Sequence, residues 1–182
     1  MSANAIRIIG GRWRGRKLRF PAVPALRPTP DRVRETLFNW LAQDLSDRTT
    51  LDLFTGSGAL SLEALSRGAV LAVAIDSDPR LAQALAQTAA RLGASGLEVH
   101  CTDAQSFLAR DKRHYDIVFL DPPFADADWE RLLPAAAQRL TAGGMLYVEA
   151  RSPIAAPAGL TVWRSDKAGR VHYHLLRHAG GT

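Results

Sequence analysis

The sequence lacks most of the features that mark secreted, membrane-spanning or metal-binding proteins. Its 182 residues include one cysteine, Cys101, which excludes an internal disulfide framework and a cysteine-rich zinc site. The longest apolar run, Ala69 to Ile75, has the length of a strand, far below the roughly 20 residues of a membrane helix. The N-terminus has no apolar signal core with a cleavage site. We therefore expect a soluble, cytoplasmic protein with one main domain.

Acidic residues are missing from the first 30 residues, which we call the basic arm. The arm carries seven Lys and Arg, whereas the rest of the chain has 16 basic and 18 acidic residues. The sequence pI near 10.0 therefore comes from one localised segment. Such a segment with an interleaved aromatic residue is typical of a surface that contacts nucleic acid, although a solvated tail has the same composition. The candidate contacts are Arg12, Trp13, Arg14, Arg16 and Lys17.

The arm has the pattern of a short hairpin that leads into a helix. Apolar residues flank Gly10-Gly11 and Gly15, which indicates two short strands around a glycine turn. An extended connector follows, because prolines stand at positions 21, 24, 28 and 30. Thr29-Pro30-Asp31 then predicts a helix start with Thr29 as its N-cap. The polar face of this helix carries Arg32, for which solvation is the ordinary explanation.

From residue 49 onward, strand-sized apolar segments alternate with helix-sized ones. The predicted strands are 49–54, 70–75, 97–101, 115–120 and 145–149. The predicted helices are 59–66, 78–92, 104–109 and 129–140. Segments 160–164 and 171–176 predict a closing hairpin. This order predicts an α/β fold, a doubly wound and mostly parallel sheet with an antiparallel C-terminal hairpin. We expect an N-terminal extension over residues 1–45 and the α/β core over residues 46–182.

A glycine loop follows the first of these strands. Residues 51–58 read LDLFTGSG, which gives a strand, a tight turn and a helix start whose free N–H groups face a ligand. Gly-x-Gly alone is a weak signal, and Ser61 stands where a dinucleotide fingerprint has its third glycine. A carboxylate at Asp52 suits a cationic ligand better than a pyrophosphate. The candidate ligand contacts in this loop are Asp52, Phe54, Gly56 and Gly58.

Carboxylates also end the second and third predicted strands. Asp76 lies 18 residues after Gly58, where an acid can accept the two ribose hydroxyls of a nucleoside. Asp103, followed by Ala104, suits either an adenine amino group or the cap of its own helix. Acids at three successive strand ends beside a glycine loop describe a nucleoside pocket without a phosphate clamp. S-adenosylmethionine, with adenosine at one end and a sulfonium at the other, fits this description.

The fourth strand ends in Asp121-Pro122-Pro123-Phe124, the sharpest signal in the chain. Two prolines fix the backbone and remove two N–H groups, which leaves the carbonyl of Pro122 as a rigid acceptor. The Asp121 carboxylate and this carbonyl together can hold both hydrogens of a planar amine, while Phe124 stacks on the base that carries it. Two fixed acceptors aim the nitrogen lone pair at a methyl group. A plain turn is the alternative reading, but the position at a strand end favours a catalytic role.

The motifs together resemble a known family. Asp52-x-Phe54-x-Gly56-x-Gly58 with the Asp-Pro-Pro-Phe loop resembles the amino methyltransferases that use S-adenosylmethionine. Residues 7–18 and 26–41 are similar to the bacterial RsmD family, whose members methylate the guanine N2 of one nucleotide in 16S ribosomal RNA. The resemblance implies a small β-element and a helix ahead of a Rossmann-like class I methyltransferase core, with RNA on the basic arm. It also implies that Thr29 and Arg32 belong to a cofactor lid, and that S-adenosylhomocysteine is the product.

Three alternatives remain open at the level of the residues. An adenine-N6 methyltransferase and a protein-glutamine amide methyltransferase need the same pair of acceptors, because each acts on a planar amine. An RNA-binding module without chemistry would keep the arm and the nucleoside pocket. His172 and His174 share one strand face, but they lack a third ligand, so we expect no metal site. Cys101 is expected to be a buried apolar residue rather than a nucleophile.

Overall fold

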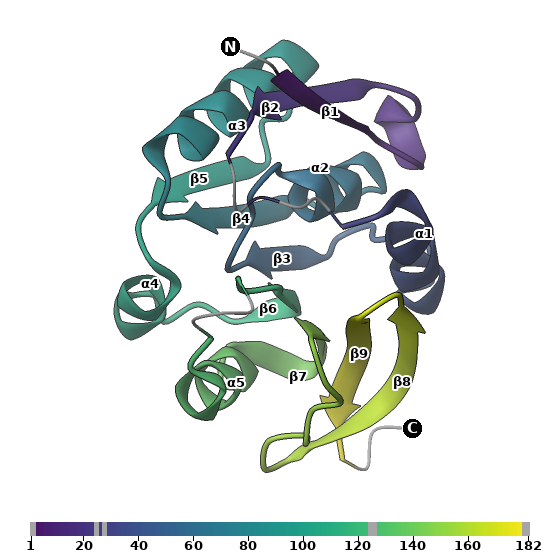
Figure 1. Ribbon diagram of the computed structural model, residues 1–182, viewed down its shortest axis with the longest axis vertical. Helices are drawn as coiled ribbons and strands as arrows, with labels where there is room; N and C mark the ends of the chain where they lie inside the picture. Colours follow the sequence, from purple (N-terminus) through teal and green to yellow (C-terminus); the bar gives the residue numbers. More distant parts are fainter. Residues whose placement is uncertain (1–2, 24–25, 27–28, 124–126, 180–182) are drawn as a thin grey trace.

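The computed structural model describes residues 3–23, 26, 29–123 and 127–179 (Figure 1). Within these residues a seven-stranded sheet has the order β5-β4-β3-β6-β7-β9-β8. Strands β3 to β7 pair in parallel, whereas β8 and β9 add an antiparallel hairpin at one edge. The predicted doubly wound sheet is therefore confirmed. The strands are β3 (Thr49–Asp52), β4 (Leu71–Asp76), β5 (Leu97–Cys101), β6 (Tyr115–Leu120), β7 (Leu140–Ala150), β8 (Leu160–Ala168) and β9 (Val171–His178).

Helices cover both faces of the sheet, as the fully apolar central strands require. In β4, Ala72 and Ala74 pack into one core cluster, while Val73 and Ile75 pack into the other. The first cluster takes residues from α1 (Asp31–Trp40), α2 (Ala59–Ser66) and α3 (Pro79–Leu92). The second takes residues from α4 (Ala104–Arg110) and α5 (Trp129–Ala137). No helix in the described part of the chain is long and apolar enough to cross a membrane.

The basic arm forms the predicted hairpin and packs onto the core. β1 (Ala3–Arg7) and β2 (Lys17–Pro21) pair antiparallel, with the 3₁₀ turn η1 (Gly11–Trp13) between them. In Figure 1 this hairpin lies beside α3. The η1 turn sits against the end of α2, where Gly11 has a φ of 70° and a Cβ built on it would meet the Ser66 carbonyl oxygen at 1.8 Å. Only glycine fits there, because the backbones touch.

A buried ion cluster fastens the arm to the helices of the core. Glu63 of α2 accepts hydrogen bonds from the backbone N–H groups of Ile9 and Gly10, each at 2.8 Å. Arg34 of α1 is also buried and donates to the Arg7 carbonyl oxygen at 3.0 Å and to Glu63 at 3.5 Å. Both charges lose their hydration, so their partners must replace it. The arm is thus held by the same residues that hold α1 against α2.

Three predictions about local structure are wrong. Thr29 is not the N-cap, because Pro30 holds that position without a side-chain cap and α1 begins at Asp31. Cys101 is exposed rather than buried, because it ends β5, the edge strand of the sheet. Helix α5 ends at Ala137 rather than at residue 140, since Leu140 already pairs with Tyr115 as the start of β7.

Candidate active site

The order of the strands reverses between β3 and β6, and the predicted site residues gather there. β3 is followed along the chain by β4 on one side, while β6 lies on its other side and continues toward β7 (Figure 1). Asp52 ends β3, Asp121 follows β6 and Glu149 lies near the end of β7. Since ligands of such sheets bind at the carboxyl ends of the strands near this reversal, the three carboxylates mark the candidate site.

Asp52 is buried in a shell of hydroxyl groups. One of its oxygens, Oδ2, accepts from the hydroxyls of Ser61 at 2.8 Å and Thr55 at 3.0 Å, and the residue is 2% exposed. Burial raises the pKa of this carboxyl to about 6, against the lowering by those two hydroxyls. Ser61, which breaks the dinucleotide fingerprint, therefore has a role of its own as a donor to Asp52.

Asp76 holds the glycine loop in place. Its Oδ2 accepts from the N–H of Gly56 at 2.8 Å, and its Oδ1 accepts from the N–H of Asp78 at 2.8 Å. Burial raises its pKa, partly offset by these backbone donors. Gly56 has a φ of 52°, and a Cβ on it would lie 2.6 Å from Leu26 Cδ1. Leu26 of the connector therefore lies against the glycine loop.

The remaining strand-end acids are helix caps. Asp78 accepts from the N–H of Arg80 at 2.8 Å and caps α3. Asp103 accepts from the N–H of Ser106 at 2.8 Å and caps α4, one of its two predicted roles. Contact with an adenine amino group stays a prediction for Asp103. Ala104 is buried as the first residue of α4, and Phe54 packs against the second core cluster. Gly58, with a φ of 78°, stands at the N-cap of α2.

Asp121 is the most electrostatically disfavoured carboxylate of the site. Burial raises its pKa well above the ordinary value, and the charges of Glu149 and Asp52 raise it further. Against these effects the hydroxyl of Thr29 donates to Asp121 Oδ2 at 3.5 Å. Pro122, whose carbonyl is the second predicted acceptor, is buried. Phe124, the predicted stacking residue, lies outside the described residues.

Glu149 is a site residue that the sequence reasoning missed. Val148 pairs with Leu120 across β7 and β6, so Glu149 and Asp121 stand side by side at the next position. Glu149 is 4% exposed, and burial raises its pKa although the hydroxyls of Tyr147 and Thr29 lower it. The signal was present, because an acid at the end of a buried parallel strand lies at the ligand-binding edge of such a sheet.

Thr29 and Arg32, the two predicted lid residues, lie in different surroundings. Thr29 is buried, its carbonyl oxygen accepts from Arg34 Nε at 3.3 Å, and its hydroxyl faces the carboxylates of the site. Arg32 is exposed on α1, where its charge acts on Asp166 of the C-terminal hairpin. The structure therefore brings Thr29 to the acids and leaves Arg32 at the surface beside β8.

The outer face of the arm is positively charged and unpaired. Arg7 and Lys17 are partners across the hairpin and both are exposed, as is Arg19. Arg12 of the η1 turn is exposed as well, and so are Arg14 and Arg16, which follow the turn. Within the described residues, no ion pair is formed by Arg7, Arg12, Arg14, Arg16, Lys17 or Arg19. Such a surface attracts a polyanion, since no acid neutralises it.

Trp13 requires a correction to its predicted place on this surface. Its ring is 9% exposed and belongs to the core cluster with Ile8 and Leu18, and its backbone N–H donates to Ser66 Oγ at 2.9 Å. Stacking on an RNA base would require the η1 turn to leave the core. Arg12 instead lies over this ring, with its guanidinium carbon 4.0 Å from the ring centroid, so Trp13 positions a surface cation.

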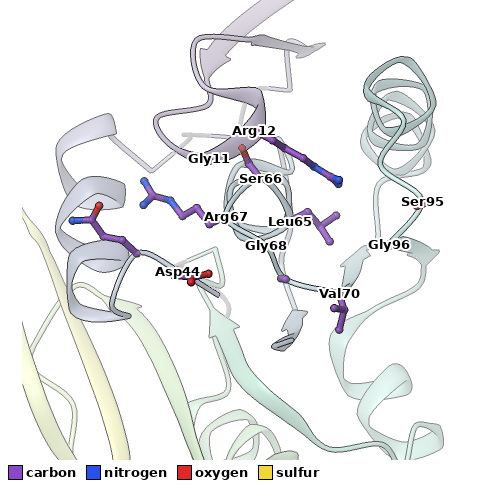
Figure 2. A pocket seen from close by; sticks show the side chains of 12 residues that line it. Gly11, Arg12, Asp44, Leu65, Ser66, Arg67, Gly68, Val70, Ser95 and Gly96 are labelled. Atoms are coloured by element: carbon purple, nitrogen blue, oxygen red, sulfur yellow. The ribbon is translucent and has the colours of Figure 1, made fainter. Parts of the chain in front are cut away.

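One cavity among the described residues lies away from Asp52, Asp121 and Glu149. It measures about 600 Å³ and is bounded by the arm, the end of α2 and the residues before β4 and β5, including Arg12, Leu65 and Val70. Figure 2 shows the side chains of Arg12 and Arg67 extending in opposite directions. A second hollow of about 410 Å³ shares Gly11 and Arg67 with it. Both lie at the amino ends of the strands, beside the basic arm.

A metal centre is not formed by the residues that the structure describes. Within those ranges, no group of three or more His, Cys, Asp or Glu residues is arranged to hold an ion. His174, one of the pair considered above, is buried with neither ring nitrogen hydrogen-bonded, and burial lowers its pKa. The ring therefore stays neutral as a packing residue.

The fold and the site define a Rossmann-like class I methyltransferase. The particular family follows from comparison with known proteins: the family described as "Conserved hypothetical protein 95" matches residues 6–177. The chain belongs to this family, and the predicted relation to RsmD proteins is confirmed by the curated relatives. "Ribosomal RNA small subunit methyltransferase D" of Escherichia coli (strain K12) is 46% identical, over 96% of this chain and 91% of that protein.

Two further similarities support the assignment to the family. The protein of the same name from Haemophilus influenzae is 36% identical, over 95% of this chain and 94% of that protein. The solved structure "Putative methyltransferase yhhF from Escherichia coli" superposes with a TM-score of 0.87 at 45% identity, over 96% of this chain and 98% of that chain. The similarity therefore extends over the arm as well as the α/β core.

Proposed function

We propose that this protein transfers the methyl group of S-adenosylmethionine to the exocyclic N2 amine of a guanine in 16S ribosomal RNA. The observation that carries the proposal is the position of Asp121-Pro122-Pro123, directly after β6 at the strand reversal and between Asp52 and Glu149. The relatives named for ribosomal RNA small subunit methylation match over nearly the whole chain, the arm included. An RNA substrate implies a cytoplasmic protein.

The donor set of the site suits this cofactor. Asp52, Asp121 and Glu149 gather at neighbouring strand ends, and each has a raised pKa because burial disfavours its charge. Among the described residues no cation forms an ion pair with Asp52, so a ligand with a positive centre would stabilise the charge of this carboxylate. Bound S-adenosylmethionine supplies such a centre, a sulfonium that carries the transferable methyl group. Asp76, Asp103 and Ala104, beside the Gly56 and Gly58 loop, would hold the adenosine part.

The residues of the Asp-Pro-Pro loop would orient the target amine. The Asp121 carboxylate and the Pro122 carbonyl accept one amine hydrogen each, which draws the nitrogen lone pair out of conjugation with the ring. Bound S-adenosylmethionine would supply the methyl group, and the amine nitrogen that takes it would lose one proton to solvent. Phe124 would stack on the extruded base. The Thr29 hydroxyl partly offsets the rise of the Asp121 pKa.

Residues 1–45 would carry the RNA and residues 46–182 the chemistry. The exposed Lys and Arg residues of the arm lie on the same side of the sheet as α1, α2 and α3. Their phosphate contacts would supply affinity without sequence information, because phosphates are alike at every nucleotide. The two hollows beside Arg12 and Arg67 widen the surface that the arm presents.

The proposal is tested by following a radioactive methyl group from the cofactor into RNA. The purified protein is incubated with unmethylated 16S RNA and, separately, with small-subunit particles, and the labelled nucleoside is identified and its position mapped. We expect N2-methylguanosine at one position. A matched RNA with inosine at that position, which lacks the N2 amine, should take no label.

Two other results would replace this proposal. Label in N6-methyladenosine or in a protein glutamine would identify one of the rival amine methyltransferases. Tight cofactor binding with no labelled product on either RNA substrate would indicate an RNA-binding module without chemistry.

A further inference from the structure

Glu149 is a buried carboxylate that the amine-orienting step leaves without a task. It lies in β7 with 4% of its surface exposed. Its Oε1 accepts a hydrogen bond of 2.8 Å from the hydroxyl of Tyr147, whose ring is wholly buried. Burying a charged carboxylate costs free energy of folding. The one hydrogen bond from Tyr147 orients the Glu149 carboxylate but does not neutralise its charge.

Strand register places Glu149 beside Asp121 on one face of the sheet. Phe119 pairs with Tyr147 in the parallel β6–β7 ladder, and both rings belong to the same core cluster. Side chains alternate along a strand, so Asp121 and Glu149, two residues further on, project to that same face. The hydroxyl of Thr29 lowers the pKa of both carboxylates, which shows that it faces both.

This pair matches the donors on one edge of guanine. Guanine presents its N2 amine directly next to the N1–H group, so two donors stand side by side. Adenine presents its N6 amine next to an unprotonated N1, which is an acceptor. With the amine held by Asp121 and the Pro122 carbonyl, a second carboxylate alongside accepts from N1–H but repels the lone pair of an adenine N1.

We propose that Glu149 selects guanine by accepting a hydrogen bond from its N1–H while Asp121 holds the neighbouring amine. The inference rests on the proposed function and adds the reason for the choice of base. Tyr147 is then a positioning residue, because its hydroxyl directs the Glu149 carboxylate. The sequence alone left guanine and adenine open, since the Asp-Pro-Pro-Phe loop reads only an amine.

The test compares two variants on two substrates. Small-subunit particles are assembled on 16S RNA that carries either guanine or 2-aminopurine at the mapped position, since 2-aminopurine keeps the 2-amino group and lacks N1–H. For wild-type protein we expect faster transfer to guanine. Glu149→Gln should lower kcat/KM on guanine by about 10- to 100-fold, because guanine loses a charge-assisted hydrogen bond, and should not lower it on 2-aminopurine, whose N1 lone pair is no longer repelled.

Tyr147→Phe provides a second and milder variant. It removes the hydroxyl that directs Glu149 and should lower transfer to guanine by about three- to tenfold while sparing 2-aminopurine. Cofactor affinity, measured by calorimetry on each variant, should change by less than about threefold. Retained transfer to 2-aminopurine shows at the same time that each variant is folded.

The outcomes separate the two proposals. Equal losses on both substrates would overturn the role of Glu149 in base selection, and a parallel loss of cofactor affinity would assign the carboxylate to the sulfonium instead. If the wild-type protein methylates neither RNA, the proposed function itself fails and the inference falls with it.

Discussion

The hydroxyl of Thr29 lies 3.5 Å from Oδ2 of Asp121, although 92 positions separate the two residues in the sequence. The contact joins the proline-containing connector of the basic arm to the loop that would hold the target amine. Arg34 completes the link, because it binds the Thr29 carbonyl oxygen on one side and the Arg7 carbonyl oxygen of the arm on the other. The arm and the catalytic loop are therefore held by one short chain of hydrogen bonds.

Replacing Thr29 by Val removes the hydroxyl and keeps the shape of the side chain. We expect Thr29→Val to lower kcat by about three- to tenfold, since one hydrogen bond to Asp121 is lost. The pKa of Asp121 rises further without this donor, so the acidic limb of the pH–rate profile moves to higher pH. Thr36→Val is the matched control, because that hydroxyl interacts with the Arg32 carbonyl oxygen and with Tyr173, neither of which is a carboxylate of the site. An unmoved profile would show that Thr29 does not act on Asp121.

The buried pair of Arg34 and Glu63 is expected to stabilise the fold. Arg34→Met leaves Glu63 without one of its cationic partners, and breaking such a pair costs about 3 kcal/mol or more in the free energy of unfolding. Chemical denaturation measures this loss. Arg48→Met, which breaks an exposed ion pair with Asp116, should change the same free energy by less than about 1 kcal/mol. Equal effects of the two substitutions would contradict the account.

Affinity for the cationic cofactor should increase with pH. Burial raises the pKa of Asp52 to about 6 from an ordinary value of 3.8, so this carboxyl is largely protonated at pH 5 and ionised at pH 7.5. The raised pKa of Asp76 acts in the same direction. Calorimetry across this range should show stronger binding of S-adenosylmethionine at the higher pH.

Product binding and one variant serve as controls for this pH dependence. S-adenosylhomocysteine lacks the sulfonium charge and should show a weaker dependence on pH. Asp52→Asn should flatten the curve for S-adenosylmethionine over the same interval. The raised pKa of Asp52 also affects the free energy of unfolding. Protonated Asp52 stabilises the folded protein below about pH 4, and this contribution is lost as the pH rises through about 6. Cofactor affinity that falls as the pH rises would contradict this assignment.

The arm should set the salt dependence of RNA binding. Changing four exposed Lys and Arg residues of the arm to Gln removes about four phosphate contacts. It should reduce the slope of log K for RNA binding against the log of the salt concentration by about 3. Cofactor affinity should not change. The control substitutes Arg110 and Lys112, exposed bases around the end of α4 on the opposite face of the sheet. An unaltered slope would make the arm a solubilising segment. In the test variant, as opposed to the control, the four substituted residues of the arm are Arg12, Arg14, Arg16 and Lys17.

Much of the fold could be predicted because local signals agree with it. The apolar pattern predicted the bounds of β5 and β6 as the structure has them. It also predicted a helix over 78–92, and α3 runs from Pro79 to Leu92 with Asp78 and Gly93 as its caps. The prediction that Thr29 is an N-cap is wrong although Thr-Pro-Asp has the pattern of a helix start. In the structure the Thr29 hydroxyl donates to Asp121 instead. The predicted burial of Cys101 is wrong because an apolar pattern does not distinguish an edge strand from a central one.

The site was predictable only where a motif carries it. The glycine loop, Asp76 and the Asp-Pro-Pro loop each stand at the end of a strand that the local apolar pattern predicts, so their position at strand ends could be predicted from the sequence. Glu149 depends on the order of strands β6 and β7, which pattern does not give. Trp13 was assigned to the surface from its basic neighbours, but the packing of η1 against α2 buries its ring.

The central claim is that Asp121 acts on the amine and not on the cofactor. The most direct measurement is single-turnover methyl transfer by Asp121→Ala, together with the Kd for S-adenosylmethionine. We expect transfer to fall by at least about 100-fold, because a fixed acceptor of the amine is lost, while Kd changes by less than about threefold. Undiminished transfer, or a loss of cofactor binding that accounts for the loss of transfer, would contradict the account.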